Sequence, residues 1–224
     1  MFSFIKAATR INCYSSRTDS LQYSMPLAMS LRRRGFCLIP TVLFVLLGTF
    51  GVAVSPSWAD ERIYALNVYV GRLTSNNWGE FFIPGEAVVF RDSYLLTAAL
   101  ARRIGTYGDK ASFEIEGQVV KHFNGQEHWE FNALVAARWE AFWWDDHLDT
   151  SLAFGLGPSF ATEKPVVESE GQNLVYWMIE LALSLPEYPQ TAVISRIHHR
   201  SNAFGLVGDE GGSNTLALGL KYRF

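Results

Sequence analysis

The sequence predicts an all-β protein, an eight-stranded antiparallel transmembrane β-barrel that follows an N-terminal leader. Three observations support this fold class. Apolar side chains alternate with polar or small ones in segments of about ten residues, the length that a tilted strand needs to cross a membrane. The linkers between these segments alternate between long and short. The chain ends on a Phe that is preceded by apolar residues at every second position.

Residues 1–59 have the pattern of a secretory leader rather than that of a barrel. Three arginines at positions 32–34 precede the apolar run 36–54, and the small-x-small sequence at 57–59 follows it. Basic, apolar and small-x-small segments in this order are typical of a cleaved signal peptide. The domain prediction is therefore a leader over 1–59 and a barrel over 60–224.

A retained transmembrane anchor is the alternative for the apolar run, because the run is just long enough to span a bilayer. Pro40 and two glycines interrupt it and a cleavage site follows directly, which favours a cleaved leader. Met29 would begin a leader of ordinary length. The start codon is therefore left open, and residues 1–28 are excluded from the fold prediction.

The composition of residues 60–224 excludes several classes of protein. Both cysteines, Cys13 and Cys37, precede this part of the chain, which excludes a disulfide scaffold and thiolate chemistry. Acidic residues outnumber basic ones in it and no basic tract is present, so nucleic acid is not an expected partner. It has no stretch of about 20 apolar residues, so no membrane-spanning helix is expected there.

The first four predicted strands are justified by their alternation. Residues 64–72 read YALNVYVGR, with bulky apolar residues at every second position. Residues 94–103 read YLLTAALARR and are apolar on both faces, so the orientation of this strand is left open. Residues 113–123, FEIEGQVVKHF, and 131–141, FNALVAARWEA, set apolar side chains against Glu, Gln, Asn and Arg.

The last four strands follow the same rule. Residues 151–160 read SLAFGLGPSF and set bulky residues against small ones. Residues 174–185, LVYWMIELALSL, and 190–201, QTAVISRIHHRS, alternate apolar residues with polar, charged or small ones over most of their length. Residues 215–224 read TLALGLKYRF and complete the even number of strands, which returns both ends of the barrel to the periplasm.

The linkers support this orientation. The long polar linkers are 74–92, 161–173 and 202–213, and the short ones are 105–110, 143–148 and 186–189. Long loops outside and short turns inside are the rule for outer-membrane barrels, although the outer linker 124–130 is short.

The polar face of the strands carries charges of both signs, which a narrow lumen tolerates when they pair. These residues are Glu114, Glu116, Arg138, Glu140, Glu180, Arg196, Arg200, Lys221 and Arg223. A soluble lipocalin-like barrel is the alternative fold, but it would bury its apolar face instead. Because side chains fill a barrel of eight strands, a channel is the least favoured function.

The aromatic residues and the C-terminus also favour the outer membrane. Trp139, Trp177 and Tyr222 lie on the apolar face, as expected of side chains at a membrane interface. A terminal Phe224 with an aromatic residue two positions before it resembles the C-terminal signal of outer-membrane barrels. The barrel-assembly machinery is therefore an expected partner, through Phe224.

His199 and Ser201 are the candidate catalytic residues. They are two apart, so they share the face of their strand that carries Val193 and Ile197, which is the lipid-facing side. The strand runs outward, so both lie near the outer leaflet, where polar side chains facing lipid are costly unless they have a function. A His beside a Ser can supply the base and the nucleophile of an ester hydrolase. The alternative is that His199 and Ser201 lie at the membrane–water interface, where polar side chains are common, and have no catalytic role.

The sequence His199-Arg200-Ser201-Asn202-Ala203, near the end of an eight-stranded barrel, resembles the PagL-like lipid A 3-O-deacylase family. The resemblance implies hydrolysis of the acyl chain ester-linked at position 3 of lipid A, in the outer leaflet of the bacterial outer membrane. It implies that His199 is the base, Ser201 the nucleophile and Asn202 a donor to the oxyanion. Lipid A or lipopolysaccharide is then the partner, and no cofactor or metal is implied.

The residue that orients His199 is left open between two candidates. The family places a Glu on the last strand, whereas Asn214 stands at the matching lipid-facing position here. Glu210 has the same parity and lies four residues further out, in a Gly-rich loop. Glu210 is the first choice. Asn214 is the alternative, and it is a possible orienter because an Asn orients the His of Cys-His-Asn proteases.

The remaining histidines predict no metal site. His198 and His199 point to opposite faces, while His122, His128 and His147 are expected to be scattered over loops and strand ends. Arg200 is expected to pair in the lumen, with a reach over the rim to a lipid phosphate as the alternative. The sequence therefore favours two functions: an ester hydrolase, or a non-catalytic barrel that stabilises the membrane or binds lipopolysaccharide. A homodimer is left open.

Overall fold

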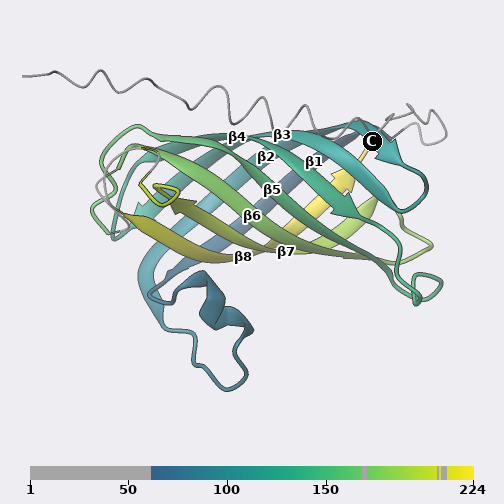
Figure 1. Cartoon of the computed structure of the whole chain (residues 1–224), viewed down its shortest axis with the longest axis horizontal. Helices are drawn as coiled ribbons and strands as arrows, with labels where there is room; N and C mark the ends of the chain where they lie inside the picture. Colours follow the sequence, from purple (N-terminus) through teal and green to yellow (C-terminus); the bar gives the residue numbers. More distant parts are fainter. Residues whose placement is uncertain (1–61, 168–170, 206, 208–210) are drawn as a thin grey trace, which may run out of the picture. The chain divides into compact units, whose positions relative to one another are not determined.

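The computed structural model describes residues 62–167, 171–205, 207 and 211–224, which form a closed antiparallel barrel (Figure 1). The strands are β1 (Tyr64–Thr74), β2 (Phe90–Tyr107), β3 (Ala111–Asn124), β4 (Trp129–Trp139), β5 (Asp149–Ala161), β6 (Asn173–Ser184), β7 (Thr191–Ser201) and β8 (Gly212–Arg223). They follow chain order around the barrel, and β1 pairs with β8 to close it. The predicted fold class is confirmed.

The predicted leader, residues 1–59, lies outside the described residues. Among the described residues, no helix has both the length and the apolar character needed to cross a bilayer. The one short helix that the structure assigns there is η1 (Trp78–Phe82), a 3₁₀ turn in the linker between β1 and β2.

Side chains alternate between the lumen and the outer wall along every strand, because successive Cβ atoms of a strand point to opposite faces. In β1, Leu66 and Val70 are 43% and 57% exposed, whereas Asn67 and Tyr69 are buried in the lumen. The apolar face is therefore the outer wall, as predicted for a membrane barrel and opposite to a soluble lipocalin-like barrel.

The orientation of β2, which its sequence left open, is set by its pairing with β1 and β3. Leu96 and Leu100 point outward, while Leu95, Thr97 and Ala99 are buried inside. β2 is also longer than predicted and runs from Phe90 to Tyr107. The extra residues pair with the ends of β1 and β3 after a register shift in each pairing, and such shifts cannot be read from a period-two pattern.

The lumen is filled by the predicted charges, which pair around Glu180. The Glu180 carboxylate accepts hydrogen bonds from Arg138 at 2.7 Å and Lys221 at 2.5 Å, and also binds Arg196. Arg138 also binds Glu114 at 2.9 Å. All of these groups except Glu114 are almost completely shielded from solvent, so the ion pairs act as a plug and not as the lining of a water-filled pore.

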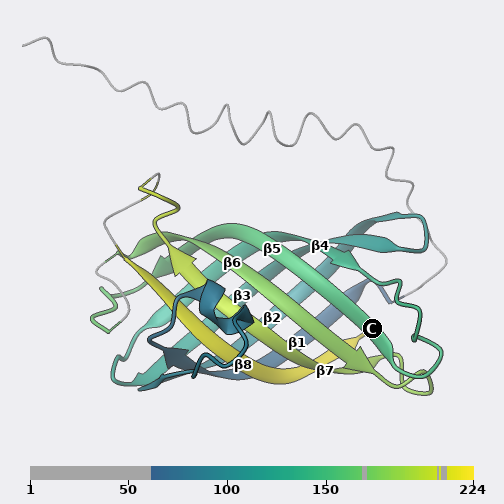
Figure 2. The ribbon, with the colours of Figure 1, turned by 60° about the horizontal axis from the view of Figure 1, so that its bottom comes forward.

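The long β1–β2 linker, residues 75–89, is the feature of the fold that positions the candidate site. Figure 1 shows it in dark blue beside one end of the barrel, and the turned view of Figure 2 shows it in front of the barrel wall. A backbone hydrogen bond from Ser75 to Val89, at 2.8 Å, closes the base of this linker.

Candidate active site

His199 and Ser201 lie on the outer face of β7, next to its outer end, as predicted. Val193, on the same face of the strand, is 50% exposed, yet His199 is only 7% exposed. One face of the His199 ring is covered by a tryptophan, which a second tryptophan backs. Trp177 of β6 stacks on the His199 ring with centroids 4.4 Å apart, and Trp78 of η1 meets Trp177 edge-on at 5.5 Å.

His199 is held by Asn214, its direct partner in the pairing of β7 with β8. His199 Nδ1 and Asn214 Oδ1 are 2.7 Å apart. The other end of the same amide, Asn214 Nδ2, donates to the Asn76 carbonyl oxygen at 2.9 Å. Because that bond uses the nitrogen of the amide, its oxygen faces the ring and His199 donates from Nδ1. The Nε2 atom then has the lone pair that a general base needs.

Asn214 is thus the candidate orienter that the structure brings to His199. The first choice from the sequence, Glu210, lies outside the described residues. Asn214 could be found from the sequence because it has lipid-facing parity and sits in register with His199.

Asn76 fixes the β1–β2 linker to the site, and nothing in the sequence analysis singled it out. Its Oδ1 accepts from the Val89 N–H at 2.7 Å, and its Nδ2 donates to the Ala87 carbonyl oxygen at 3.1 Å and to Glu80 Oε2 at 3.0 Å. Side-chain hydrogen bonds from Asn77 and Asn76 lower the pKa of Glu80, so Glu80 stays a charged acceptor at neutral pH. These bonds hold the Asn76 backbone carbonyl group in the position where it accepts the hydrogen bond from Asn214.

Ser201 is the last residue of β7, and the backbone turns sharply after it. Ala203 and Phe204 have positive φ angles of 49° and 60°, which is uncommon for residues other than Gly. The turn aims the Ala203 N–H at Ser201 Oγ, at 3.4 Å. Within the described ranges, Ser201 Oγ has no hydrogen bond to His199. Hydrogen bonds between catalytic groups are often long before substrate binds.

The predicted oxyanion donor, Asn202, lies in the same turn. Its backbone N–H donates to the Gly211 carbonyl oxygen at 3.4 Å, and its own carbonyl oxygen accepts from the Val207 N–H at 3.1 Å. The structure adds a donor that the sequence did not identify by residue: the Ala203 N–H, which already points at the candidate nucleophile.

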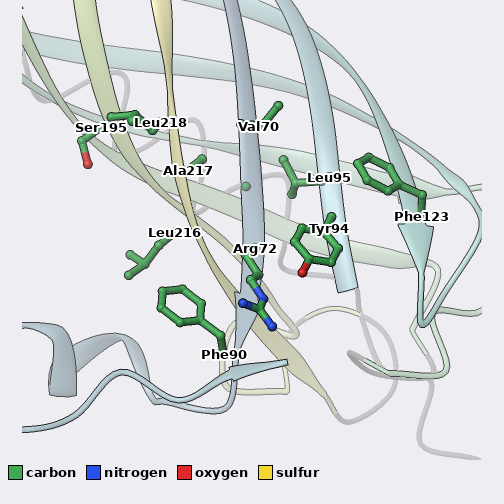
Figure 3. Close-up of a pocket in the computed structure, with 11 residues that line it drawn as sticks. Val70, Arg72, Phe90, Tyr94, Leu95, Phe123, Ser195, Leu216, Ala217 and Leu218 are labelled. Atoms are coloured by element: carbon green, nitrogen blue, oxygen red, sulfur yellow. The ribbon is translucent and has the colours of Figure 1, made fainter. Parts of the chain in front are cut away.

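A groove of about 410 Å³ lies on the outer wall just below this site (Figure 3). Leu216, one outward position from Asn214 on β8, lines it together with Val70 and Leu218. At the end of the groove nearest the outer rim, the Arg72 guanidinium lies over the rings of Phe90 and Tyr94, at 5.4 and 5.2 Å from their centroids. The groove is therefore mostly apolar and has a cation at one end.

Arg200 lies in the lumen, as expected, and does not reach over the rim. Its Nε donates to Ser159 Oγ at 2.8 Å, and the guanidinium is 3.6 Å from Glu130. The expectation that His122 and His128 are scattered is wrong. They stack on each other at the outer end of the lumen, because the β3–β4 hairpin folds residues six apart back together.

No family model and no curated protein matches this sequence. Among solved structures, the barrel is similar to the outer membrane enzyme PagL, with a TM-score of 0.55 and 13% identity over 71% of this chain and 99% of that chain. The chain has the fold of a bacterial outer-membrane β-barrel. At this identity the likeness shows the fold and no more.

Two further solved structures are similar at lower scores. Neisserial surface protein A has a TM-score of 0.45 and 9% identity, with 72% of this chain and 97% of that chain covered. Ail, the attachment invasion locus protein of Yersinia pestis, has a TM-score of 0.34 and 12% identity, with the same coverage of 72% and 97%.

Proposed function

We propose that this protein is an outer-membrane ester hydrolase that removes the 3-O-linked acyl chain of lipid A. The observation that carries the proposal is the 2.7 Å hydrogen bond between His199 Nδ1 and Asn214, on the outward face of the barrel and two residues from Ser201. A base oriented in this way and facing the outer leaflet has little structural purpose, because the lumen already contains the charges that fill the barrel.

The proposed reaction is acyl transfer through the serine. His199 Nε2 accepts the Ser201 proton as Ser201 Oγ attacks the ester carbonyl carbon. The Ala203 N–H and the Asn202 side chain stabilise the oxyanion that forms. The sugar hydroxyl leaves with the proton from His199. Water then attacks the acyl-serine, with His199 again as base, and releases the fatty acid.

The surroundings of the site support a lipid substrate. The groove below Asn214 is apolar and lies on the lipid-facing wall, so it suits an acyl chain. Arg72 and Arg91 lie at the same outer end of β1 and β2, where they can meet the phosphate groups of lipid A. Trp177 covers one face of His199, and Trp78 packs against Trp177.

The second candidate is a non-catalytic barrel that stabilises the membrane or binds lipopolysaccharide. It is favoured by one specific observation: the described orienter is an amide, which stabilises the charged imidazolium less than a carboxylate does. In that case the polar groups around His199 would contact a sugar or phosphate headgroup without cleaving it.

The two functions are separated by ester hydrolysis with the purified, folded barrel in detergent micelles. A long-chain p-nitrophenyl ester is the substrate, and a serine-directed fluorophosphonate tests the nucleophile. We expect Ser201→Ala to lose hydrolysis and labelling together. Thr191→Ala removes an outward-facing hydroxyl at the other end of β7 and should leave both unchanged. Absence of labelling and hydrolysis in the folded wild type would support the non-catalytic barrel.

A further inference from the structure

We propose that His122, His128 and Glu130 form a binding site for a divalent transition-metal ion at the outer end of the lumen. Each offers one ligand atom, and these atoms all lie within 4.8 Å of one another. All three side chains are at most 3% exposed. The site faces the lumen, away from the outward side of β7 that carries His199, so it does not depend on the proposed hydrolase activity.

The β3–β4 hairpin assembles the site. His122 is on β3, Glu130 is on β4, and His128 is in the loop between them. The backbone N–H of His122 donates to the backbone carbonyl oxygen of His128 at 3.0 Å, which continues the hairpin pairing into the loop. The two imidazole rings then stack at 4.1 Å, with 13° between their planes. Ligands on one hairpin need little rearrangement to close on an ion.

The distances suit a small ion. His122 Nε2 and Glu130 Oε2 are 2.8 Å apart, because a hydrogen bond joins them. Zinc bonds to nitrogen and oxygen are about 2.0–2.2 Å long, so two ligand atoms in a tetrahedral site are about 3.4 Å apart. The ion would replace the proton of this hydrogen bond, and the pair would open by about half an ångström.

Neighbouring side chains orient the carboxylate for this role. Glu130 Oε1 accepts hydrogen bonds from His198 Nε2 at 2.9 Å and from Asn132 Nδ2 at 2.7 Å. The second oxygen, Oε2, is turned toward His122. Hydrogen bonds to a ligating carboxylate are a regular feature of protein metal sites and fix its direction.

Gln126 allows His122 to change its tautomer. The Gln126 side-chain amide lies 3.2 Å from His122 Nδ1. With its NH₂ group toward Nδ1, the amide leaves the His122 proton on Nε2, which then donates to Glu130. When the amide turns over, its oxygen accepts a proton from Nδ1, and Nε2 can bind the metal.

Arg200 is the group that opposes a cation here, and the donor atoms decide which ions still bind. Its Nε is 3.6 Å from Glu130 Oε2, beyond hydrogen-bond distance, and donates instead to Ser159 at 2.8 Å. The positive charge lowers the affinity for every dication. Two imidazoles and one carboxylate retain most affinity for Cu²⁺ and Zn²⁺, at the strong end of the metal series, and little for Mg²⁺ or Ca²⁺.

The test uses the tag-free folded barrel in detergent, stripped with a chelator. Titration with Zn²⁺ is followed by calorimetry, and Co²⁺ is followed by visible absorption. We expect one ion per chain. His128→Phe keeps the ring stack and removes a ligand nitrogen, so it should lower the Zn²⁺ affinity at least about tenfold and abolish the Co²⁺ absorption.

The matched control is His147→Phe, which removes an exposed imidazole from the β4–β5 linker and should leave the affinity unchanged. A second measurement does not depend on whether the His128→Phe variant folds. Zn²⁺ should raise the thermal midpoint of the wild type, because an ion that binds only the folded state stabilises it. Wild-type barrel that binds no Zn²⁺, or His128→Phe barrel that binds it equally well, would overturn the proposal.

Discussion

Asn214 holds His199 in the way that the carboxylate of a Ser-His-Asp triad holds its His. An amide can orient the ring, but it would add no negative charge to the imidazolium that forms in the proposed reaction. Asn214 depends in turn on the Asn76 carbonyl group, which fixes which end of its amide faces His199. His199 is therefore oriented by two asparagines from distant parts of the chain.

Replacing Asn214 with Ala tests this arrangement. We expect Asn214→Ala to lower kcat for ester hydrolysis by about 10- to 1,000-fold, less than the loss of a triad Asp causes, with a small change in KM. Steady-state kinetics of the folded barrel checks it. Leu220→Ala, at a lipid-facing position near the other end of β8, is the control. An unchanged kcat would show that Asn214 does not orient the base.

The sequence predicted part of this site, for reasons that the residues make plain. The outward direction of His199 and Ser201 follows from parity, and the contact of Asn214 follows from register. Asn76 and Trp78 could not be predicted, because they lie in a linker whose path has no periodic signal. The stacking of His122 on His128 was missed because 124–130 was predicted as a linker, whereas the pairing of β3 with β4 continues into it.

At the scale of elements, the β1–β2 linker joins the outer rim to the part of the barrel wall that carries His199. Its own hydrogen bonds close it around Asn76, and Trp78 extends from it onto Trp177. The strands themselves were predictable from alternation, and their ends moved by only a few residues except in β2. There, Phe90–Asp92 follow a register shift beyond Arg72, which a period-two pattern cannot show.

Asn76→Ala should open this linker. The side chain loses its bonds to Val89, Ala87 and Glu80, and the carbonyl group that holds Asn214 loses its fixed place. We expect faster cleavage within 75–89 in limited proteolysis and a several-fold lower kcat. Asn77→Ala is the matched control: in the described part of the chain its side chain hydrogen-bonds to Glu80 alone, so the change should cause little of either effect. Equal effects of the two variants would contradict the role of Asn76.

The whole molecule is organised by the separation of charge from lipid. The outer wall is apolar, and the ion pairs around Glu180 lie in a narrow lumen, which gives a rigid wall on which a site can be built. The sequence predicted this arrangement because balanced charges on one strand face are compatible only with mutual pairing. It could not predict that three cations would converge on one carboxylate, since that depends on how the strands are arranged around the barrel.

Removal of that carboxylate should destabilise the barrel. Glu180→Gln leaves Arg138, Arg196 and Lys221 with a buried excess of positive charge, so we expect the free energy of unfolding to fall by about 3–5 kcal/mol. Urea unfolding in lipid vesicles measures it. Glu140→Gln changes a partly exposed ion pair with Arg103 at 4.0 Å and should cost about 1 kcal/mol or less. Equal losses of unfolding free energy in the two variants would show that the ion pairs around Glu180 stabilise the barrel no more than an exposed pair does.

Mass spectrometry of lipid A is the direct test of the proposal that Ser201 cleaves an ester of lipid A. Cells expressing the wild type or Ser201→Ala are compared, with both barrels shown to be folded in the outer membrane. We expect lipid A from wild-type cells to lose one hydroxyacyl chain and lipid A from Ser201→Ala cells to keep it. Lipid A that is the same in both would rule out cleavage by Ser201 and favour the non-catalytic barrel.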